Sequence, residues 1–336
     1  MSFSVHVEPS GHIFTVEDDE LILDAALRQG FALPYGCRGG ACGSCLGQIL
    51  EGSVAYPDGD PIALGDDEKA ANKAIFCQAV ATSDLVIEAR EVGAAKDIPI
   101  KVLPCRVAEK KQLTHDVMLL ELKLPATERI QFLAGQYIDF LLKDGKKRTF
   151  SIANAPHDDE FIELHIRHIP DGRFTGEVFE NMKVKDIMRI EGPMGSFFLR
   201  EDSNRPIIFM AGGTGFAPIK GIIEHMIQVG IDREVHLYWG VETEADLYMN
   251  KLAQGWAEQH DNIEYIPVLS GEDIEGWQGR TGYVTDVIAA DFDDLSNYEI
   301  YASGAPAMVY AGKDLFEAKG LNLDNYYSDA FEFAND

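Results

Sequence analysis

Basic residues are scarce in this chain of 336 residues. Lys and Arg total 29 against 56 Asp and Glu, which gives a formal net charge of −27. Neutralising the phosphates of nucleic acid or of an anionic membrane needs Lys and Arg, so the composition argues against both kinds of partner. The negative charge suits a basic protein partner, or it serves solubility alone.

Long apolar runs are also lacking. The most apolar short run, PIIFMAGGTGFAPI, is too brief and too rich in glycine to span a bilayer. The start, MSFSVHVEPSGHIF, has neither the basic residues nor the apolar core of a signal peptide. No fixed-period repeat occurs. We therefore expect a cytoplasmic monomer of two or three domains.

Cysteine is the third scarce residue, with five in the chain, and four of them form one pattern. Cys37, Cys42, Cys45 and Cys77 have the spacing C-x4-C-x2-C followed by a distant cysteine. This plant-type ferredoxin spacing predicts four thiolate ligands of a [2Fe–2S] cluster. Zinc ribbons usually have two C-x2-C pairs, and a disulfide pattern would leave the glycines of the loop unexplained. Cys105 lies outside the pattern and is expected in a core.

The cysteine loop, GCRGGACGSC, has few large side chains. Gly36, Gly39, Gly40 and Gly43 are expected to adopt positive φ and to bring backbone N–H groups close to the cluster. Arg38 is the one long side chain, and we expect it to project at the surface where an electron acceptor binds.

The residue pattern divides the chain into three domains and a linker. Residues 1–92 predict a small mixed α+β domain that holds the cluster, and residues 93–100 are typical of a linker. Residues 101–200 are nearly all strands and turns, which indicates an antiparallel barrel. Residues 201–336 alternate strands with helices, which predicts a doubly wound parallel α/β sheet.

Several elements can be placed within these domains. The first domain is expected to have a hairpin, a helix that ends at Gly30, and single strands over residues 46–56 and 85–92. In the last domain, residues 244–260 predict one continuous helix.

The strand in KKRTFSIANAP carries side chains that suit a flavin. Alternation places Arg148 and Phe150 on one face, with Thr149 between them, and Ser151 on the other face. An Arg can hold a phosphate, an aromatic ring can cover the flavin ring, and a Ser hydroxyl can hydrogen-bond a ring nitrogen.

A second flavin segment follows in HIRHIPDGRFTGEVF. His165, Ile166 and Arg167 are predicted on a strand, with a turn at Gly172. A helix that starts near Thr175 would offer free N–H groups to a pyrophosphate. The alternative for Thr175 is an ordinary helix cap.

A nicotinamide segment is predicted in IIFMAGGTGFAPIKGII. Gly212, Gly213, Thr214 and Gly215 form a turn between a strand and a helix that carries Pro218 early. The G-x-G-x-x-G fingerprint of dehydrogenases is absent, so a plain strand-to-helix turn is the alternative.

Acidic residues follow the next strand, in YWGVETEADLY. Glu242, Glu244 and Asp246 would repel a 2′-phosphate and can accept hydrogen bonds from a free ribose hydroxyl. This favours NADH over NADPH as the electron donor. The alternative is that some of these acids only stabilise a helix N-terminus.

These motifs, in this order, resemble one family over essentially the whole chain. It is the family of iron–sulfur flavoprotein reductases, in which a plant-type ferredoxin domain precedes a ferredoxin-NADP reductase-like module. LPYGCRGGACGSC, LPCRV and GTGFAPIK are most similar to its CDP-6-deoxy-Δ3,4-glucoseen reductase group, and oxygenase reductase components are related. The resemblance implies a β-grasp ferredoxin domain, a barrel that binds FAD, with FMN as the alternative, and a nicotinamide domain.

The resemblance also implies residue roles near the hydride. The family's R-x-Y-S flavin motif matches Arg148 to Ser151, with Phe150 in place of Tyr. An aromatic residue near the chain end often lies beside the flavin, and Phe331 is preferred here over Phe333. With Ser151 and Ser303, Phe331 is expected at the hydride-transfer site.

A second family motif, C-G-x-P-x-M, falls in YASGAPAMVYAG. It matches Ser303, Gly304, Pro306 and Met308. Ser303 stands where Cys is common, beside the expected nicotinamide, so tuning of hydride transfer is expected to differ.

The resemblance implies that electrons pass from NADH to FAD, then to the cluster, then to an acceptor protein of a ring oxygenase or a CDP-deoxysugar dehydrase. Flavin belongs between donor and cluster because it accepts a hydride and releases single electrons. A redox-regulatory or electron-storage protein without a dedicated enzymatic partner is the alternative. Residues 1–92 carry fifteen acidic and five basic residues, so this domain is expected to dock a basic acceptor.

Overall fold

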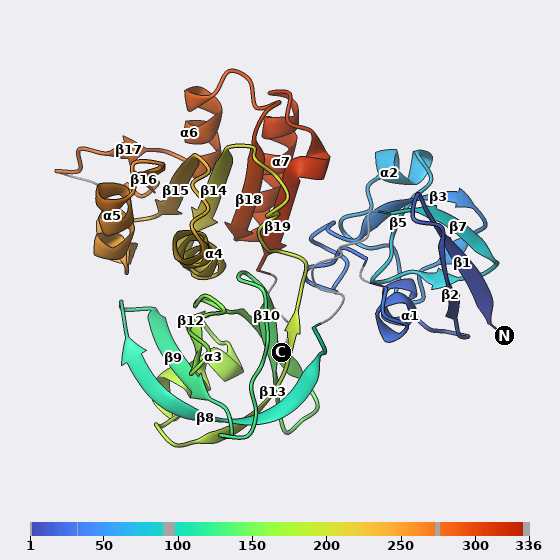
Figure 1. Cartoon of the computed structure of the whole chain (residues 1–336), viewed down its shortest axis with the longest axis horizontal. Coiled ribbons are helices and arrows are strands. Elements are labelled where there is room, and N and C mark those ends of the chain that lie inside the picture. Colours follow the sequence, from blue (N-terminus) through green and yellow to red (C-terminus); the bar gives the residue numbers. More distant parts are fainter. Residues whose placement is uncertain (1, 32, 90–97, 273–275, 332–336) are drawn as a thin grey trace. The chain divides into compact units, whose positions relative to one another are not determined.

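The computed structural model describes the chain apart from residues 1, 32, 90–97, 273–275 and 332–336 (Figure 1). The chain forms two compact units, residues 1–99 and 100–336. The predicted linker, residues 93–100, lies mostly outside the described residues. None of the described helices is long and apolar enough to cross a membrane.

The first unit is a mixed sheet with a helix across it. Its sheet has the order β2-β1-β7-β3-β5, in which only the β1–β7 pair is parallel. The elements of this unit are β1 (Phe3–Glu8), β2 (His12–Val16), α1 (Ile22–Arg28), β3 (Leu46–Glu51), β4 (Val54–Ala55), α2 (Asp66–Ala70), β5 (Lys73–Ile75), β6 (Val80–Ala81) and β7 (Leu85–Glu88). This is the β-grasp arrangement. The single strand expected over residues 46–56 is wrong, because Gly52, with φ of 95°, separates β3 from β4.

Helix α1 holds the segment that carries Cys77, the fourth cysteine of the cluster pattern. Its apolar residues Ile22 and Leu23 are fully buried. Their backbone N–H groups donate to the carbonyl oxygens of Ala79 and Phe76 at 2.9 and 3.0 Å. Free N–H groups at a helix start need such acceptors, so the helix start fixes the turn around Cys77.

The second unit begins with an antiparallel six-stranded barrel (Figure 1). Its sheet order is β11-β10-β13-β8-β9-β12, and the bridge between Ile152 and Leu164 joins the two ends. The elements are β8 (Lys101–Gln112), β9 (Val117–Lys123), β10 (Tyr137–Leu141), β11 (Lys147–Ser151), β12 (Ile162–Arg167), α3 (Arg173–Glu180) and β13 (Ile187–Met194). Cys105 lies in the barrel core, as expected, and burial raises the pKa of its thiol to about 12.

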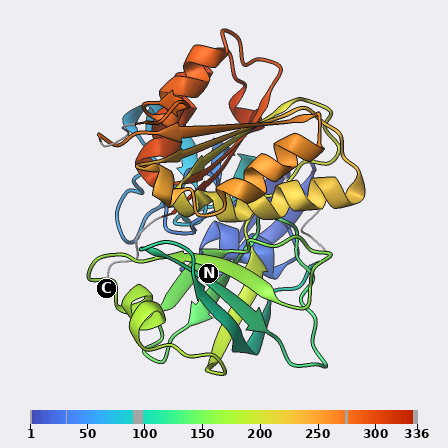
Figure 2. The same cartoon turned by 90° about the vertical axis from the view of Figure 1, so that its left-hand side faces the viewer.

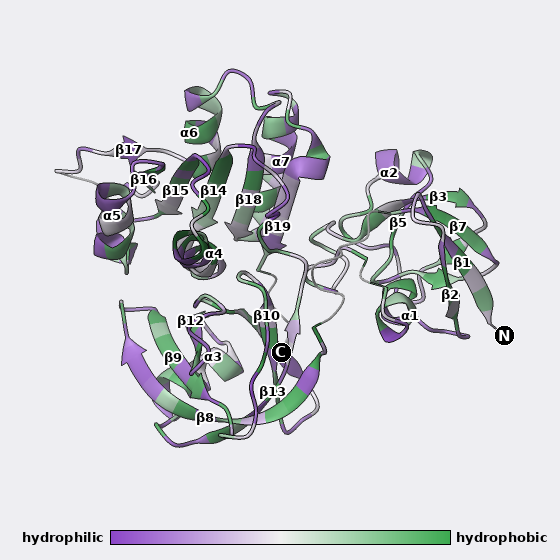
Figure 3. Cartoon of the chain, viewed as in Figure 1, coloured by the Kyte–Doolittle hydropathy of each residue, from purple (hydrophilic) through white to green (hydrophobic). Residues whose placement is uncertain are grey.

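A six-stranded parallel sheet follows in the same unit, in the order β17-β16-β15-β14-β18-β19. Its elements are β14 (Ile207–Gly212), η2 (Gly213–Gly215), α4 (Phe216–Val229), β15 (Val235–Val241), η3 (Glu244–Asp246), α5 (Asn250–Gln259), β16 (Ile263–Leu269), β17 (Arg280–Thr281), α6 (Val284–Asp291), β18 (Glu299–Gly304), α7 (Pro306–Glu317), η4 (Leu323–Asn325) and β19 (Tyr326–Ala330). Helices α4 and α5 cover one face of the sheet, and α6 and α7 the other (Figure 2). The central strands β14 and β18 are strongly hydrophobic because both of their faces are covered (Figure 3).

The helix predicted over residues 244–260 is wrong at its start. A short 3-10 turn, η3, is closed by a capping box between Thr243 and Asp246. The α-helix begins only at Asn250. Tyr248 therefore lies in the irregular segment between the two helical pieces.

Strand order reverses between β14 and β18, which lie side by side at the centre of the sheet. Ligands of open parallel sheets bind at the carboxyl ends of the strands at such a reversal. Both glycine turns singled out in the sequence, after β14 and at the end of β18, lie at this point.

Candidate cluster, flavin and nicotinamide sites

The cysteine loop is shaped by close backbone contacts. Gly40 has φ of 81°, and a Cβ there would lie 2.8 Å from Cγ of Gln78 and 3.0 Å from Cβ of Pro61. Glycine is therefore required at this position. The expectation of positive φ holds for Gly40 and Gly43 only, and Arg38, with φ of 56°, takes the third left-handed position of the loop.

The four predicted cluster ligands converge. The backbone N–H groups of Cys37 and Gly39 donate to Sγ of Cys42 and Cys37, each at 3.3 Å. Sharing a hydrogen bond with Cys42, and accepting backbone N–H groups, lowers the pKa of Cys37 to about 5. Cys45 and Cys77 share a similar bond, which lowers the pKa of Cys77. Four convergent sulfurs with N–H donors fit the thiolate set of a [2Fe–2S] cluster.

Arg38 does not project freely, contrary to expectation. Its guanidinium forms an ion pair with Asp24 and lies 5.9 Å from the ring centroid of Tyr35. The backbone carbonyl of Arg38 accepts a hydrogen bond from Gln78 Nε2 at 2.8 Å. Arg38 thus ties the cysteine loop to helix α1 and to the turn that carries Cys77.

The predicted flavin strand is β11. Arg148 and Phe150 are partly buried, and Thr149 between them is exposed and donates to Oδ1 of Asp139 at 2.6 Å. The Phe150 ring lies against Phe174, with centroids 5.6 Å apart. Ser151, which follows on the other face, is buried.

The second flavin segment is strand β12 and the turn after it. Ile166 faces the barrel core. Beyond the bridge at Leu164, no strand in the described chain pairs with the open edge of β12, so its main chain is available to a ligand. The His165 side chain is directed elsewhere, to Tyr248, which leaves the main chain of His165 for a cofactor.

Helix α3 begins at Arg173, two residues before the expected start. Gly172 precedes it, and no side chain caps this end in the described structure. Thr175 is not the cap: its hydroxyl accepts from the Ile169 N–H at 3.1 Å and orders the preceding turn. The uncapped N–H groups fit a pyrophosphate.

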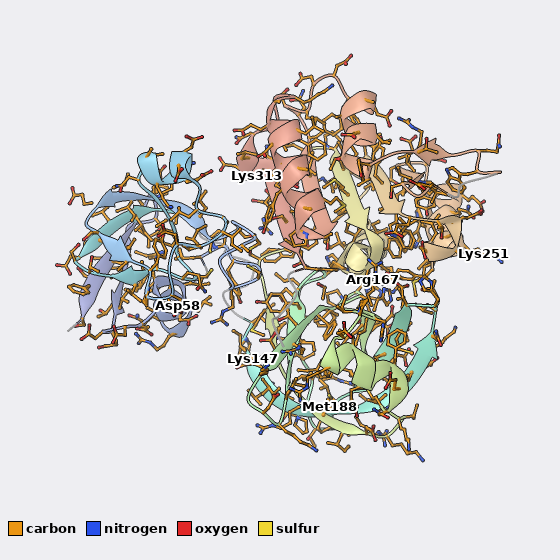
Figure 4. All side chains as sticks on the ribbon, turned by 180° about the vertical axis from the view of Figure 1, so that it is seen from behind. Asp58, Lys147, Arg167, Met188, Lys251 and Lys313 are labelled. Atoms are coloured by element: carbon orange, nitrogen blue, oxygen red, sulfur yellow. The ribbon has the colours of Figure 1, made fainter. Side chains whose placement is uncertain are left out.

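Arg167 lies between the barrel and the parallel sheet (Figure 4). Its Nε donates to Oδ2 of Asp116 at 2.8 Å. A Cβ at Gly213 would lie 3.7 Å from the Arg167 guanidinium, so this charge lies beside the predicted nicotinamide turn.

The two glycine turns of the parallel sheet touch each other. A Cβ at Gly215 would lie 1.9 Å from the carbonyl oxygen of Ser303, and one at Gly212 would lie 2.6 Å from Met308 Sδ. Thr214 is buried, Pro218 is in the first turn of α4, and Pro306 is the first residue of α7. The N-termini of α4 and α7 supply free N–H groups, and the glycines let a ligand approach the backbone closely. This arrangement fits a dinucleotide.

A group that sequence reasoning missed joins the barrel to this sheet. Asp329 is the parallel-sheet neighbour of Ser303, and its Oδ2 accepts a hydrogen bond from Ser151 Oγ at 2.7 Å. The Phe331 N–H donates to the carbonyl of Gly304 at 2.8 Å. The three residues expected at the hydride-transfer site, Ser151, Ser303 and Phe331, are therefore joined through one strand pair. Phe333 lies outside the described residues.

The Ser303 hydroxyl is fully buried and has no hydrogen-bond partner in the described structure. A buried hydroxyl without a partner is costly, and a bound ligand can supply what is missing. This orphaned group fits the expected nicotinamide beside Ser303.

The acidic residues after β15 differ in whether their carboxylates are free to bind a ribose. Asp246 is used in the capping box with Thr243, so the helix-terminus alternative fits this residue. Glu242 and Glu244 are exposed, and Glu242 directly follows β15 at the carboxyl edge of the sheet. Glu242 is therefore the better placed of the three to meet a ribose.

Three family models match successive parts of the chain. Residues 5–82 match a 2Fe-2S iron-sulfur cluster binding domain, and residues 104–199 an oxidoreductase FAD-binding domain. Residues 209–314 match an oxidoreductase NAD-binding domain.

Curated relatives match over nearly full length. RfbI of Salmonella typhimurium is 42% identical, over 100% of this chain and 98% of that protein. The CDP-6-deoxy-L-threo-D-glycero-4-hexulose-3-dehydrase reductase of Yersinia pestis is 40% identical, over 98% of this chain and 99% of that protein. The phenol 2-monooxygenase reductase component DmpP of a Pseudomonas species is 37% identical, over 93% of this chain and 89% of that protein.

The chain belongs to the iron–sulfur flavoprotein reductases.

Solved structures agree with this family. The reductase resembles the Amycolatopsis cytochrome P450 reductase GcoB with a TM-score of 0.78 and 31% identity, over 98% of each chain. It resembles the ferredoxin reductase in carbazole 1,9a-dioxygenase with a TM-score of 0.70 and 30% identity, over 99% of each chain. The reductase is an iron–sulfur flavoprotein oxidoreductase with FAD-binding and NAD-binding domains, and its relatives support electron transfer to a partner protein. When bound, flavin converts the hydride of the nicotinamide into the single electrons that a [2Fe–2S] cluster accepts.

Proposed function

We propose that the acceptor of this reductase is a dehydrase that acts on a CDP-linked 6-deoxyhexulose. One observation carries this proposal: the Yersinia pestis relative, named as the reductase of such a dehydrase, matches 98% of this chain at 40% identity. An oxygenase component is the second candidate acceptor, favoured by the 37% identity to a phenol monooxygenase reductase component.

Reconstitution distinguishes the two acceptors. The purified reductase is mixed with NADH and either the dehydrase with its CDP-linked hexulose or a phenol oxygenase component with phenol. Coupled NADH oxidation with formation of the 3-deoxy product is expected only with the dehydrase. Coupled hydroxylation of phenol without turnover of the sugar would move the proposal to the second candidate.

We infer that NADH is the electron donor and that the reductase acts as a cytoplasmic monomer. Exposed Glu242 at the edge of the nicotinamide site supports NADH, because a carboxylate repels a 2′-phosphate. Cysteines that serve as thiolate ligands of a cluster, and not as disulfide partners, suit a reducing compartment.

We further propose that the acceptor docks on the surface beside the cysteine loop. Ile62 is 83% exposed, and its neighbours Pro61 and Ala63 lie against Gly40 and Gly43 of that loop. Exposed acidic residues flank this segment in the sequence: Asp58, Asp60, Asp66 and Asp67. An apolar residue within an acidic rim suits a partner that has an apolar pocket within a basic rim.

Replacing Ile62 tests this surface better than replacing Arg38, since Arg38→Glu would also break the ion pair with Asp24. Ile62→Ser is expected to slow acceptor reduction about tenfold, the range of an interface residue worth 1–2 kcal/mol. Reduction of ferricyanide, a small acceptor that needs no docking surface, should be unchanged. Ile13→Ser, at the exposed Ile13 of β2, is the matched control. Equal acceptor rates for Ile62→Ser and wild type would exclude Ile62 from the docking surface.

A further inference from the structure

One face of strand β12 lies against the nicotinamide domain. Alternation along the strand puts Glu163, His165 and Arg167 on the face opposite to Leu164 and Ile166, which fill the barrel core. Each of the three meets a different part of the parallel-sheet domain. Glu163 pairs with Lys220 of α4 at 3.2 Å, His165 meets Tyr248, and Arg167 lies beside Gly213.

The central contact on this face is between His165 and Tyr248. The His165 side chain is fully buried, its Nδ1 lies 3.0 Å from the Tyr248 hydroxyl, and its Nε2 lies 2.8 Å from Oε1 of Glu163. Burial lowers the pKa of His165, although the hydrogen bond to Glu163 opposes this. A neutral imidazole with its proton on Nε2 satisfies both contacts, because Nε2–H then donates to the carboxylate and Nδ1 accepts from the tyrosine hydroxyl.

Tyr248 continues this contact to the nicotinamide turn. Its ring meets the Trp239 ring edge-on, with centroids 5.1 Å apart at 86°. The Trp239 indole N–H donates to the carbonyl of Gly213 at 3.0 Å, and Trp239 stacks on Phe216 with centroids 3.9 Å apart. A continuous series of side chains therefore runs from strand β12 of the barrel to the nicotinamide turn at Gly213.

We propose that Tyr248 and His165 are positioning residues for hydride transfer: their hydrogen bond sets the placement of the nicotinamide turn against strand β12 of the flavin-binding barrel. Hydride transfer depends steeply on the placement of the two rings, so a small displacement at this contact is costly in rate. Neither side chain needs to touch the reacting atoms. The proposal concerns the flavin-reducing half of the reaction and holds whichever acceptor protein is correct.

The charged groups around His165 come from several elements. Glu163 is on its own strand, Lys220 and Glu224 are on α4 and form a 2.9 Å pair, and Asp116, in the turn before β9, binds Arg167. Among the described residues, the Tyr248 hydroxyl is the neutral hydrogen-bond donor to His165. Removing it leaves Nδ1 without a partner and destabilises the neutral imidazole, so the His165 pKa is expected to rise in the variant.

The test uses the reductase loaded with flavin and cluster. Tyr248→Phe keeps the ring and removes the hydroxyl. Tyr265→Phe is the matched control, because the Tyr265 hydroxyl, on β16, also makes one hydrogen bond, and this bond of 2.9 Å to Asn250 Oδ1 stays within the nicotinamide domain. Stopped-flow flavin reduction at saturating NADH, calorimetric NAD⁺ binding and ¹⁵N NMR of histidine are measured for each protein.

Tyr248→Phe is expected to slow flavin reduction about tenfold. The affinity of this variant for NAD⁺ should change less than about threefold. Its rate of flavin reduction is expected to fall further as the pH drops through the raised pKa of His165. NMR of the wild type should show His165 protonated on Nε2 alone. His165→Leu with Tyr248→Phe should be no slower than the slower single variant. An unchanged rate in Tyr248→Phe, an equal loss in Tyr265→Phe, or a wild-type His165 protonated on Nδ1 would overturn the proposal.

Discussion

The hydroxyl of Ser151 donates a hydrogen bond to Oδ2 of Asp329 at 2.7 Å, across 178 positions of sequence. Both residues are buried. Ser151 ends the flavin strand β11, and Asp329 neighbours Ser303 in the parallel sheet. One hydrogen bond thus joins the flavin strand to the strand pair that carries Ser303.

Ser151→Ala and Asp329→Asn are each expected to slow flavin reduction about tenfold. A hydrogen bond to a charged group is worth about 1.5–3 kcal/mol, enough for that change in rate. Because the two residues share one bond, the double variant should be about as slow as the slower single variant. Stopped-flow reduction by NADH measures this, with Ser203→Ala, in the turn before β14, as the control. Rate losses that multiply in the double variant would contradict the shared role.

Ser303→Ala is expected to raise the melting temperature of the reductase without nicotinamide. It removes a buried hydroxyl that has no partner in the described structure, and such a group costs about 1–3 kcal/mol. Saturating NAD⁺ should stabilise the wild type more than the variant. Ser270→Ala, which removes a hydroxyl bonded to the Val241 carbonyl at 3.2 Å, should lower the melting temperature. A variant less stable than wild type in both states would show that Ser303 is satisfied within the protein.

Cys77→Ser is expected to abolish the visible absorbance and iron content of the cluster while NADH still reduces the flavin. The reason is that Cys77 supplies one of four convergent sulfurs in the first unit, whereas the flavin and nicotinamide sites lie in the second. Cys105→Ser, in the barrel core, should keep the cluster and lose about 1–3 kcal/mol of stability from a buried hydroxyl. Iron lost in Cys105→Ser but retained in Cys77→Ser would overturn the ligand assignment.

Glu242→Arg is expected to move the reductase from NADH toward NADPH. The exposed carboxylate is replaced by a cation that can bind a 2′-phosphate. The ratio of kcat/KM for NADPH to that for NADH should rise roughly tenfold or more, the worth of one charge-assisted hydrogen bond. Glu258→Arg, at an exposed position of α5, makes the same charge change away from the site. A similar shift in Glu258→Arg would attribute the effect to net charge.

Glu163→Gln is expected to flatten the acid dependence of stability. Burial alone would raise the pKa of Glu163, but the hydrogen bond to His165 and the charge of Lys220 lower it to about 2. A carboxyl whose pKa is lower in the folded state stabilises the protein fully at pH values above its ordinary pKa of 4.5. This stabilisation is lost as the pH falls toward the folded-state pKa of about 2. Urea unfolding of both proteins from pH 6 to pH 2.5 should show a wild-type advantage that shrinks with acid. A difference that stays constant with pH would contradict the ionised pair.

Features encoded by neighbouring residues could be predicted from the sequence. The cysteine spacing and the glycine turn after β14 depend on backbone requirements that a short segment carries in full. Asp329 could not be found this way, because its role comes from parallel pairing with Ser303 and from contact with a distant barrel strand. Nothing in the local sequence YYSDAF distinguishes this carboxylate from a surface acid.

The His165 contact shows a second kind of limit. His165 was predicted on a strand and lies on β12, but its partner side chain depended on where α5 begins. One helix over residues 244–260 would have placed Tyr248 within helical backbone. The capping box between Thr243 and Asp246 ends that segment early and leaves Tyr248 in an irregular turn.

Gly215 packs so closely on the Ser303 carbonyl that there is no room for a Cβ at position 215. The residues allowed at positions 215 and 303 are therefore linked, although the two positions are far apart in the sequence. A side chain at Gly215 would have to push the Ser303 backbone away from a distance of 1.9 Å. Ser303 is paired in register with Asp329, and Asp329 holds Ser151, so that push would be transmitted to the flavin strand. The hydrogen bond between Ser151 of the barrel and Asp329 therefore restricts which residues position 215 can accept during evolution. A homologue with a larger residue at position 215 should also differ at Ser303 or Asp329.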